Sequence, residues 1–220
     1  MANMIVDFKT SKLESAIVRA PFNKATSILK KRGYQQISLE QDAKLRMLQE
    51  SLYSKHGNLV REAVLYNLKE KPRMVRNPPT LYLSSEAVQP HKESSEFYLT
   101  DKQIEQARAD SIELPEGEFW IPTNRLVDDE ITNWMFGENN KNFGNFLRDK
   151  GIMGLPIWVL DKNYVMMNVS AHPEIKRPHS QQKAFIRPVW FADLPRCNSY
   201  IFCNYFGLSD NFWARGIRTI

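Results

Sequence analysis

The stretch YQQISLEQDAKLRMLQESLYSKHGNLVREAVLYNL, residues 34–68, changes its hydrophobic period part of the way along. Its first six residues alternate between polar and apolar, which predicts a short strand with Ile37 and Leu39 facing inward. From Glu40 onward leucines recur every three or four positions, as on one face of an amphipathic helix. After Gly57, residues 59–68 carry apolar side chains at a similar spacing. The stretch therefore predicts a strand, a helix, a turn and a second helix.

The residues around this stretch extend the helical prediction toward the N-terminus. Residues 11–32 contain two short apolar-periodic runs separated by Pro21, which predicts two short helices because proline interrupts a longer one. Prolines at positions 72, 78 and 79 end the helical region. Residues 81–99 are rich in small, polar and charged side chains and are predicted to be a linker. We therefore expect a basic helical region over residues 1–80 and a second domain over residues 100–220.

The C-terminal part has the patterns of a mixed domain. Residues 155–169 resemble a hairpin, with two apolar runs on either side of Asp161-Lys-Asn163. Apolar runs at 184–191 and 200–206 are expected to join the same sheet. Further elements are predicted at residues 100–110, 128–136 and 140–148 as helices, and at 118–122 as a strand. The predicted fold class is α+β: a mostly helical N-terminal part with one short strand, then a mixed domain with an antiparallel sheet.

Composition excludes several classes of protein. The chain has 220 residues, 42% of them hydrophobic and 25% charged, with no apolar run long enough to span a membrane and no secretory signal pattern. We expect a cytoplasmic protein without membrane association. With only Cys197 and Cys203, neither a disulfide framework nor a four-cysteine zinc site can form. Those thiols do not have zinc-site spacing with His172 and His179, so no metal is expected.

No complete catalytic motif is present in the sequence. Phosphate-loop, dinucleotide-binding and nucleophile-elbow patterns are all missing. The sequence thus predicts no cofactor and favours a protein that is not an enzyme. An enzyme of unfamiliar type, using His172, His179 or the acidic run Asp128-Asp129-Glu130, is the least supported alternative.

Charge is unevenly distributed along the chain. Residues 1–80 carry 15 Lys or Arg against 7 Asp or Glu, residues 81–138 carry 4 against 13, and residues 139–220 carry 11 against 5. Basic surfaces concentrate polyanions and replace the counterions of a phosphate backbone. The basic run Lys30-Lys31-Arg32 belongs to the first block. Two basic surfaces separated by an acidic one are expected, and the acidic block would face away from nucleic acid or dock on a basic patch.

Residues 34–70, and in particular Leu59-Val60-Arg61-Glu62-Ala63, resemble the ribbon-helix-helix DNA-binding family. The resemblance implies that paired strands would enter the major groove of DNA, with Tyr34, Gln36 and Ser38 reading base edges. It also implies that backbone amides near Asn58, at the start of the second helix, would bind a phosphate. The alternative is an ordinary strand and helical hairpin within a larger α+β core.

The C-terminal half combines aromatic and basic residues. Seventeen of the 25 aromatic residues follow position 118. Aromatic rings beside Lys and Arg hold single-stranded nucleic acid by stacking on its bases, although such rings also build protein cores. The candidate nucleic-acid-binding residues in this half are Arg187, Trp190, Arg196, Arg215 and Arg218.

The preferred hypothesis is a non-enzymatic nucleic-acid-binding protein, either a DNA-binding regulator or a subunit of a nucleoprotein complex. Its partner would be DNA or RNA, and it would act as a homodimer or in a larger assembly. The alternative is a structural or interaction protein that binds other chains through its acidic middle and its apolar C-terminal tail.

Overall fold

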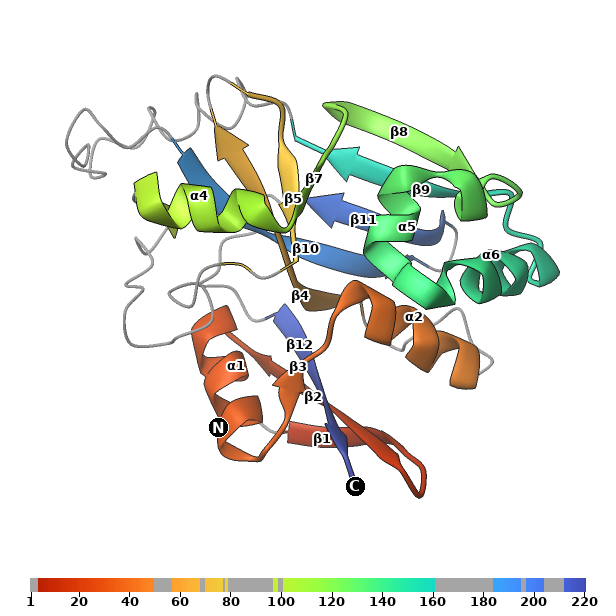
Figure 1. Cartoon of the computed structure of the whole chain (residues 1–220). Helices are drawn as coiled ribbons and strands as arrows, with labels where there is room; N and C mark the ends of the chain where they lie inside the picture. The colour runs from red at the N-terminus through yellow and green to blue at the C-terminus, as the bar shows by residue number, and fades with distance from the viewer. Residues whose placement is uncertain are drawn as a thin grey trace.

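The chain folds around one large mixed β-sheet in the computed structural model (Figure 1). The structure describes residues 4–49, 57–67, 70–76, 78, 97–98, 101–160, 184–194, 197–203 and 212–220. The strands are β1 (Met4–Lys9), β2 (Leu13–Ala20), β3 (Gln35–Gln36), β4 (Asn58–Asn67), β5 (Arg73–Val75), β6 (Phe97–Tyr98), β7 (Ser111–Glu113), β8 (Gly117–Pro122), β9 (Gly154–Val159), β10 (Ala184–Leu194), β11 (Cys197–Cys203) and β12 (Phe212–Thr219). Their main order across the sheet is β1-β2-β12-β4-β10-β11-β9-β8.

Strands from both ends of the chain are neighbours in this sheet. β12 pairs antiparallel with β2 along eight residues, from Phe212 opposite Ala20 to Thr219 opposite Leu13. β4 pairs antiparallel with β10. Residues 1–80 and residues 100–220 therefore contribute to the same sheet.

The helices pack on this sheet in two groups. They are α1 (Phe22–Lys31), α2 (Leu39–Leu48), α4 (Asp101–Ala109), α5 (Glu130–Phe136) and α6 (Asn140–Asp149), with 3-10 turns η1 (Leu126–Asp128) and η2 (Gly137–Asn139). α2, α5 and α6 lie together on one side (Figure 1), over a core that includes Phe136, Phe143 and Phe191. α1 covers β2 and β12 through Ala25 and Leu29. Within the described part of the chain, no helix has the length and apolar character needed to span a membrane.

The predicted fold class is wrong for the N-terminal part. The chain starts with strands rather than helices, and more residues lie in strands than in helices. The first of the two helices predicted over residues 11–32 is β2, whereas the second is present as α1. The sheet is also not purely antiparallel, because β12 pairs parallel with β4 and β11 pairs parallel with β9.

The second helix predicted after Gly57 is instead β4. Its even-numbered residues Val60, Val64 and Tyr66 enter the core beneath α2, α5 and α6. Leu59, Ala63 and Leu65 enter a second core, which also contains residues of α4. A strand that is buried on both faces is apolar almost throughout, so the usual alternation of polar and apolar residues is lost. Some of its apolar residues are then three or four positions apart by chance, as in a helix.

Several predictions of elements are confirmed. α2, α4, β8, α5 and α6 lie where the sequence predicts them, and Ile37 and Leu39 are fully buried. The predicted linker, apart from β6, lies outside the described residues, as do the second strand of the predicted hairpin, His172 and His179.

Candidate polyanion-binding surface

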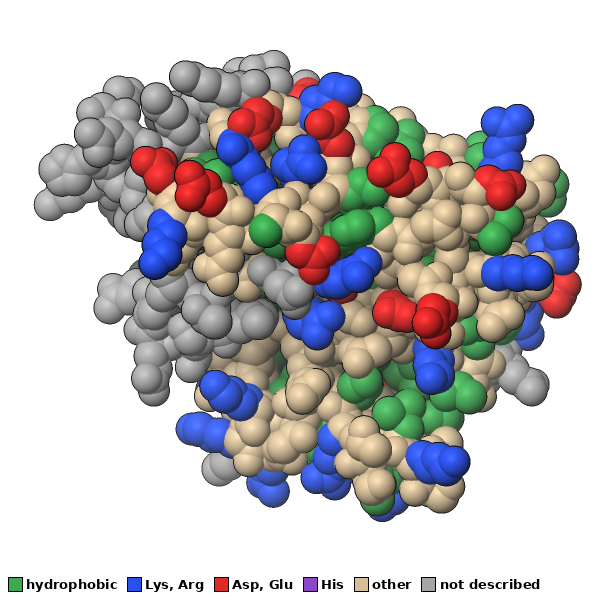
Figure 2. Space-filling model, in the orientation of Figure 1, with side chains coloured by type: hydrophobic (Ala, Val, Ile, Leu, Met, Phe, Trp, Pro, Cys, Tyr) green, Lys and Arg blue, Asp and Glu red, His purple; other side chains and the backbone are tan. Residues whose placement is uncertain are grey.

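One lobe of the fold contains many basic residues and few acidic ones. This basic lobe consists of β1, β2, α1, β3 and β12, that is, residues 4–36 and 212–220. It contains nine Lys or Arg and two Asp or Glu, a balance of +7 that exceeds the +5 of the whole chain. Lys and Arg side chains gather in the lower part of Figure 2, where no acidic side chain is visible. Eight of the cations are exposed: Lys9, Lys12, Arg19, Lys24, Lys30, Lys31, Arg32 and Arg218.

Glu14, one of the two acidic residues of the lobe, is neutralised inside it. It is 3% exposed and forms ion pairs with Lys9 at 3.2 Å and Arg218 at 2.7 Å. A hydrogen bond donated by the Tyr34 hydroxyl, supported by those two cations, lowers the pKa of Glu14. Burial, and the same hydrogen bond to Glu14, raise the pKa of Tyr34. The carboxylate therefore adds little negative potential outside the lobe.

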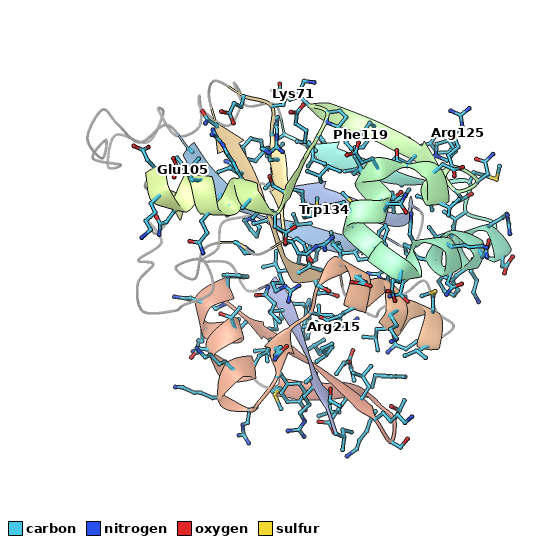
Figure 3. The ribbon with its side chains drawn as sticks, in the orientation of Figure 1. Lys71, Glu105, Phe119, Arg125, Trp134 and Arg215 are labelled. Carbon is cyan, nitrogen blue, oxygen red and sulfur yellow. The ribbon has the colours of Figure 1, made fainter. Side chains whose placement is uncertain are left out.

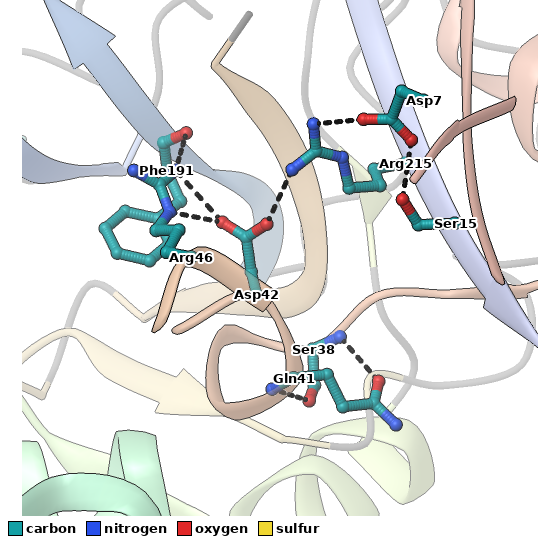
Figure 4. Close-up of polar contacts among 8 residues, drawn as sticks. All are labelled: Asp7, Ser15, Ser38, Gln41, Asp42, Arg46, Phe191 and Arg215. Carbon is teal, nitrogen blue, oxygen red and sulfur yellow. Dashed lines mark hydrogen bonds and ion pairs between the residues drawn. The ribbon is translucent and has the colours of Figure 1, made fainter. Parts of the chain in front are cut away.

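Asp7, the second acidic residue of the lobe, is bound within a chain of polar side chains (Figure 4). Its Oδ2 pairs with Nη2 of Arg215 at 2.7 Å, and Ser15 donates a hydrogen bond to its Oδ1 at 2.5 Å. Arg215 is 1% exposed and also pairs with Asp42 of α2 at 3.2 Å. Asp42 in turn binds Arg46 at 3.0 Å.

This Asp7-Arg215-Asp42-Arg46 network ends at Phe191. The guanidinium of Arg46 lies 3.9 Å from the centre of the Phe191 ring. In Figure 3, Arg215 lies between β12 and α2. The network therefore fixes the basic lobe to the remaining part of the fold, and Arg215 cannot contact an external ligand.

Arg32 and Arg218 bring together two basic segments that are far apart in the sequence. Arg32 follows the last turn of α1, which contains Lys30 and Lys31. Arg218 of β12 donates a hydrogen bond from Nη1 to the Arg32 carbonyl at 3.3 Å, and its guanidinium lies 4.6 Å from the centre of the Tyr34 ring. Cations at a helix C-terminus also stabilise the helix dipole. That effect accounts for three residues of the lobe but not for the exposed cations on β1, β2 and the start of α1.

The residues proposed to read DNA bases have structural contacts instead. Tyr34 is 4% exposed and packs under α1. Gln36 donates from Nε2 to the Val60 carbonyl at 2.9 Å. Ser38 caps α2, accepting from the Gln41 backbone amide at 3.1 Å while Gln41 accepts from the Ser38 amide. Asn58 is fully buried in β4, so the helix that would start there is absent.

The C-terminal candidates are also separated by the structure. Arg187 is 2% exposed on β10, and Trp190 packs against the core under α4. Arg196 lies outside the described residues. Of the twelve candidates, only Lys30, Lys31, Arg32 and Arg218 meet on the exposed basic lobe. Sequence reasoning missed Lys9, Lys12, Arg19 and Lys24. Strand pairing brings Lys9 beside Arg218 through their shared partner Glu14, whereas Arg19 lies opposite Trp213, toward the other end of β12.

The acidic residues in the described part of the chain form neither a metal site nor a catalytic cluster. No group of three His, Cys, Asp or Glu side chains that could hold a metal ion is found there. Asp128 ends η1, Glu130 is the first residue of α5, and the Asp129 side chain accepts a hydrogen bond from the Thr132 amide at 2.9 Å. Asp129 therefore caps α5.

Comparison with known proteins relates this chain to a fold. No protein-family model matches it, and no curated protein is detectably similar to it in sequence. A solved structure described as "Accommodation of massive sequence variation in Nanoarchaeota by the C-type lectin fold" is similar, with a TM-score of 0.60 and 12% sequence identity. The similarity covers 98% of this chain and 100% of the nanoarchaeal chain. Together with the sheet described above, it shows that the fold of this chain resembles the C-type lectin fold.

Proposed function

We propose that this protein binds nucleic acid through the basic lobe. The observation that supports the proposal is the concentration of eight exposed cations on a lobe with two acids, of which Asp7 pairs with the buried Arg215 and Glu14 with Lys9 and Arg218. Such a surface attracts a phosphate backbone over long distances and releases the counterions condensed on it. Both DNA and RNA provide that backbone.

The arrangement of the lobe favours contacts to phosphates over reading of bases. Lys24 and Lys31 lie two turns apart on α1, both exposed, and Arg32 and Arg218 extend this surface onto β12. Tyr34, one aromatic residue of the lobe, is buried and unable to stack on a base. We therefore expect binding with little dependence on base sequence.

The similar nanoarchaeal structure supports placing the function at the surface. Its description concerns a C-type lectin fold that accommodates massive sequence variation. By analogy, we propose that binding by this chain is determined by its exposed side chains, while the sheet and its buried ion pairs maintain the fold.

A binding titration at several salt concentrations tests the proposal. The probes are fluorescently labelled single-stranded DNA, single-stranded RNA and duplex DNA of mixed sequence, measured by anisotropy. If about five lobe cations contact phosphates together, a fourfold rise in salt should lower the affinity by about 500-fold for duplex DNA and about 130-fold for the single strands. Binding to vesicles containing phosphatidylserine but not to any of the nucleic acids would overturn the proposal.

Matched charge-removal variants locate the binding surface. The lobe variant changes Lys24, Lys30, Lys31 and Arg32 to Gln, and the control variant changes four exposed cations elsewhere, Lys102, Lys141, Arg148 and Lys150, to Gln. Both variants lose the same charge. The lobe variant should reduce the salt slope by about 3 to 4, whereas the control should leave most of it unchanged. Equal losses in the two variants would refute binding by the lobe.

A further inference from the structure

The two edge strands of the main sheet carry exposed apolar side chains. Among the described strands, β1 pairs only with β2, and β8 pairs only with β9. The outer edge of such a strand presents backbone N–H and C=O groups to which another strand can add. On β1, Ile5 is 50% and Val6 is 46% exposed; on β8, Trp120 is 55% exposed. Natural edge strands are usually protected by charges or by bulges.

Trp120 is held in a defined position on its edge. A Cβ atom on Gly154, in the neighbouring strand β9, would lie 2.0 Å from Nε1 of Trp120. The indole therefore lies directly against the backbone of β9, at a position that only glycine leaves open. Met153, which precedes this glycine, is 74% exposed. Tryptophan and methionine on a surface are typical of protein–protein contacts.

The charges around the two edges are opposite. Residues 101–138, which run from α4 through β8 to α5, contain ten Asp or Glu and three Lys or Arg, a balance of −7. The basic lobe, which contains β1, has a balance of +7. In Figures 1 and 2, α4 and β8 lie in the upper part of the molecule and the basic lobe in the lower part. The molecule thus has a basic end and an end where this acidic segment lies, called the acidic end, at which Lys71 and Arg73 also pair with Glu113.

These charges decide which pair of edges can meet. Two β1 edges would bring two basic lobes together, and two β8 edges would bring two acidic surfaces together; both contacts are repulsive. A β1 edge beside a β8 edge brings opposite net charges together, and each strand has one exposed charge of the corresponding sign, Lys9 on β1 and Glu118 on β8. Each edge strand has six residues, so the two match in length.

We propose that a second copy of this chain docks head to tail, with its β1 edge against the β8 edge of the first copy. Ile5 and Val6 point to opposite faces of β1, so one of them covers Trp120 while the other lies on the opposite face of the joined sheet, and the basic lobe of one copy faces the acidic end of the next. The two surfaces are different, so the first pair leaves one edge free at each end. Further copies add to these edges, and the contact generates a chain or a ring rather than a closed symmetric dimer.

Sedimentation velocity of nuclease-treated protein tests the proposal through two complementary variants. Ile5→Glu places a negative charge on the β1 edge and leaves β8 intact; Trp120→Lys places a positive charge on the β8 edge and leaves β1 intact. Each variant alone should be monomeric. A mixture of the two should form a 1:1 dimer and nothing larger, since only one pair of intact edges remains. Wild-type protein should form species larger than a dimer as its concentration rises, and fewer of them at high salt.

Control variants distinguish a block of the edge strands from a general effect of changing an exposed apolar residue. Val127→Lys and Leu48→Glu change residues that are 45% and 51% exposed but lie outside both edge strands, so these variants should assemble as the wild type does. Val6→Glu provides a second block of the β1 edge, and circular dichroism confirms that each variant is folded. Monomeric wild-type protein at every concentration, a wild-type dimer that grows no further, or a variant mixture that stays monomeric would overturn the proposal. Because nucleic acid is absent, failure here leaves the basic-lobe proposal standing.

Discussion

Glu62 gives the stability of this protein a predictable dependence on pH. The side chain lies in β4 and is 2% exposed, and its Oε2 accepts a hydrogen bond from the Leu39 backbone amide at 2.9 Å. Burial raises the pKa of Glu62 from 4.5 to about 7, although the Leu39 amide and the nearby Arg61 and Arg76 act in the opposite direction. The charged form is therefore less favourable in the folded protein than in the unfolded chain.

The sign and size of the effect follow from proton linkage. Between pH 4.5 and about 7 the folded protein retains a proton on Glu62 that the unfolded chain releases. The contribution of Glu62 to folding stability is therefore highest below pH 4.5, decreases as the pH rises through this window and is lowest above about 7. The difference of about 2.5 pKa units corresponds to about 3 kcal/mol.

Glu62→Gln removes this titration while keeping an oxygen that can accept from the Leu39 amide. We expect the variant to be more stable than wild type by up to about 3 kcal/mol at about pH 8, and nearly equal to it at about pH 4. Urea denaturation at several pH values measures the difference. Glu105→Gln, at an exposed position on α4 (Figure 3), is the control and should behave as wild type. If wild type and Glu62→Gln lose stability in parallel across the window, Glu62 is not the group responsible and the reasoning is refuted.

Two further predictions concern buried polar contacts. Asp42→Ala removes the carboxylate that pairs with both Arg46 and Arg215, so two buried guanidinium groups lose this partner. Urea denaturation should show that the free energy of unfolding falls by about 3 to 5 kcal/mol. A fall below about 1 kcal/mol would contradict the stabilising role of the network. Ser38→Ala removes the cap of α2 and should cost about 1 kcal/mol of stability. Its affinity for nucleic acid should not change, whereas reduced binding without a loss of stability would support a base-reading role.

Local sequence patterns were sufficient to predict a helix or strand that has one buried face. α1, α4 and α6 each bury a limited set of side chains, such as Phe143 and Leu147 in α6. The periodicity of α helices at the surface is then visible in the sequence. β2 and β4 were missed because both of their faces are covered. In β2, Ala16 and Val18 lie beneath α1, and Ile17 between them is also buried.

Half of the eight exposed cations were predicted: Lys30, Lys31 and Arg32, which form a contiguous run, and Arg218. The other half depends on strand pairing. Lys9 and Lys12 approach Arg218 because β1 and β12 lie on either side of β2, and no feature near residue 12 or residue 218 specifies that pairing. Contacts between residues that are distant in sequence depend on the whole fold.

Arg215 and Arg218 illustrate why residue type alone could not define the surface. They lie three positions apart on β12, and successive side chains on a strand point to opposite faces. Arg215 faces α2 and is 1% exposed, whereas the Arg218 side chain is 43% exposed. The buried arginine connects Asp7 of β1 with Asp42 of α2 and so holds the basic lobe against the helices that pack on the sheet. Because that connection fixes the lobe, the exposed cations keep a constant distance from the acidic end, which both the proposed nucleic-acid contact and the proposed head-to-tail contact require.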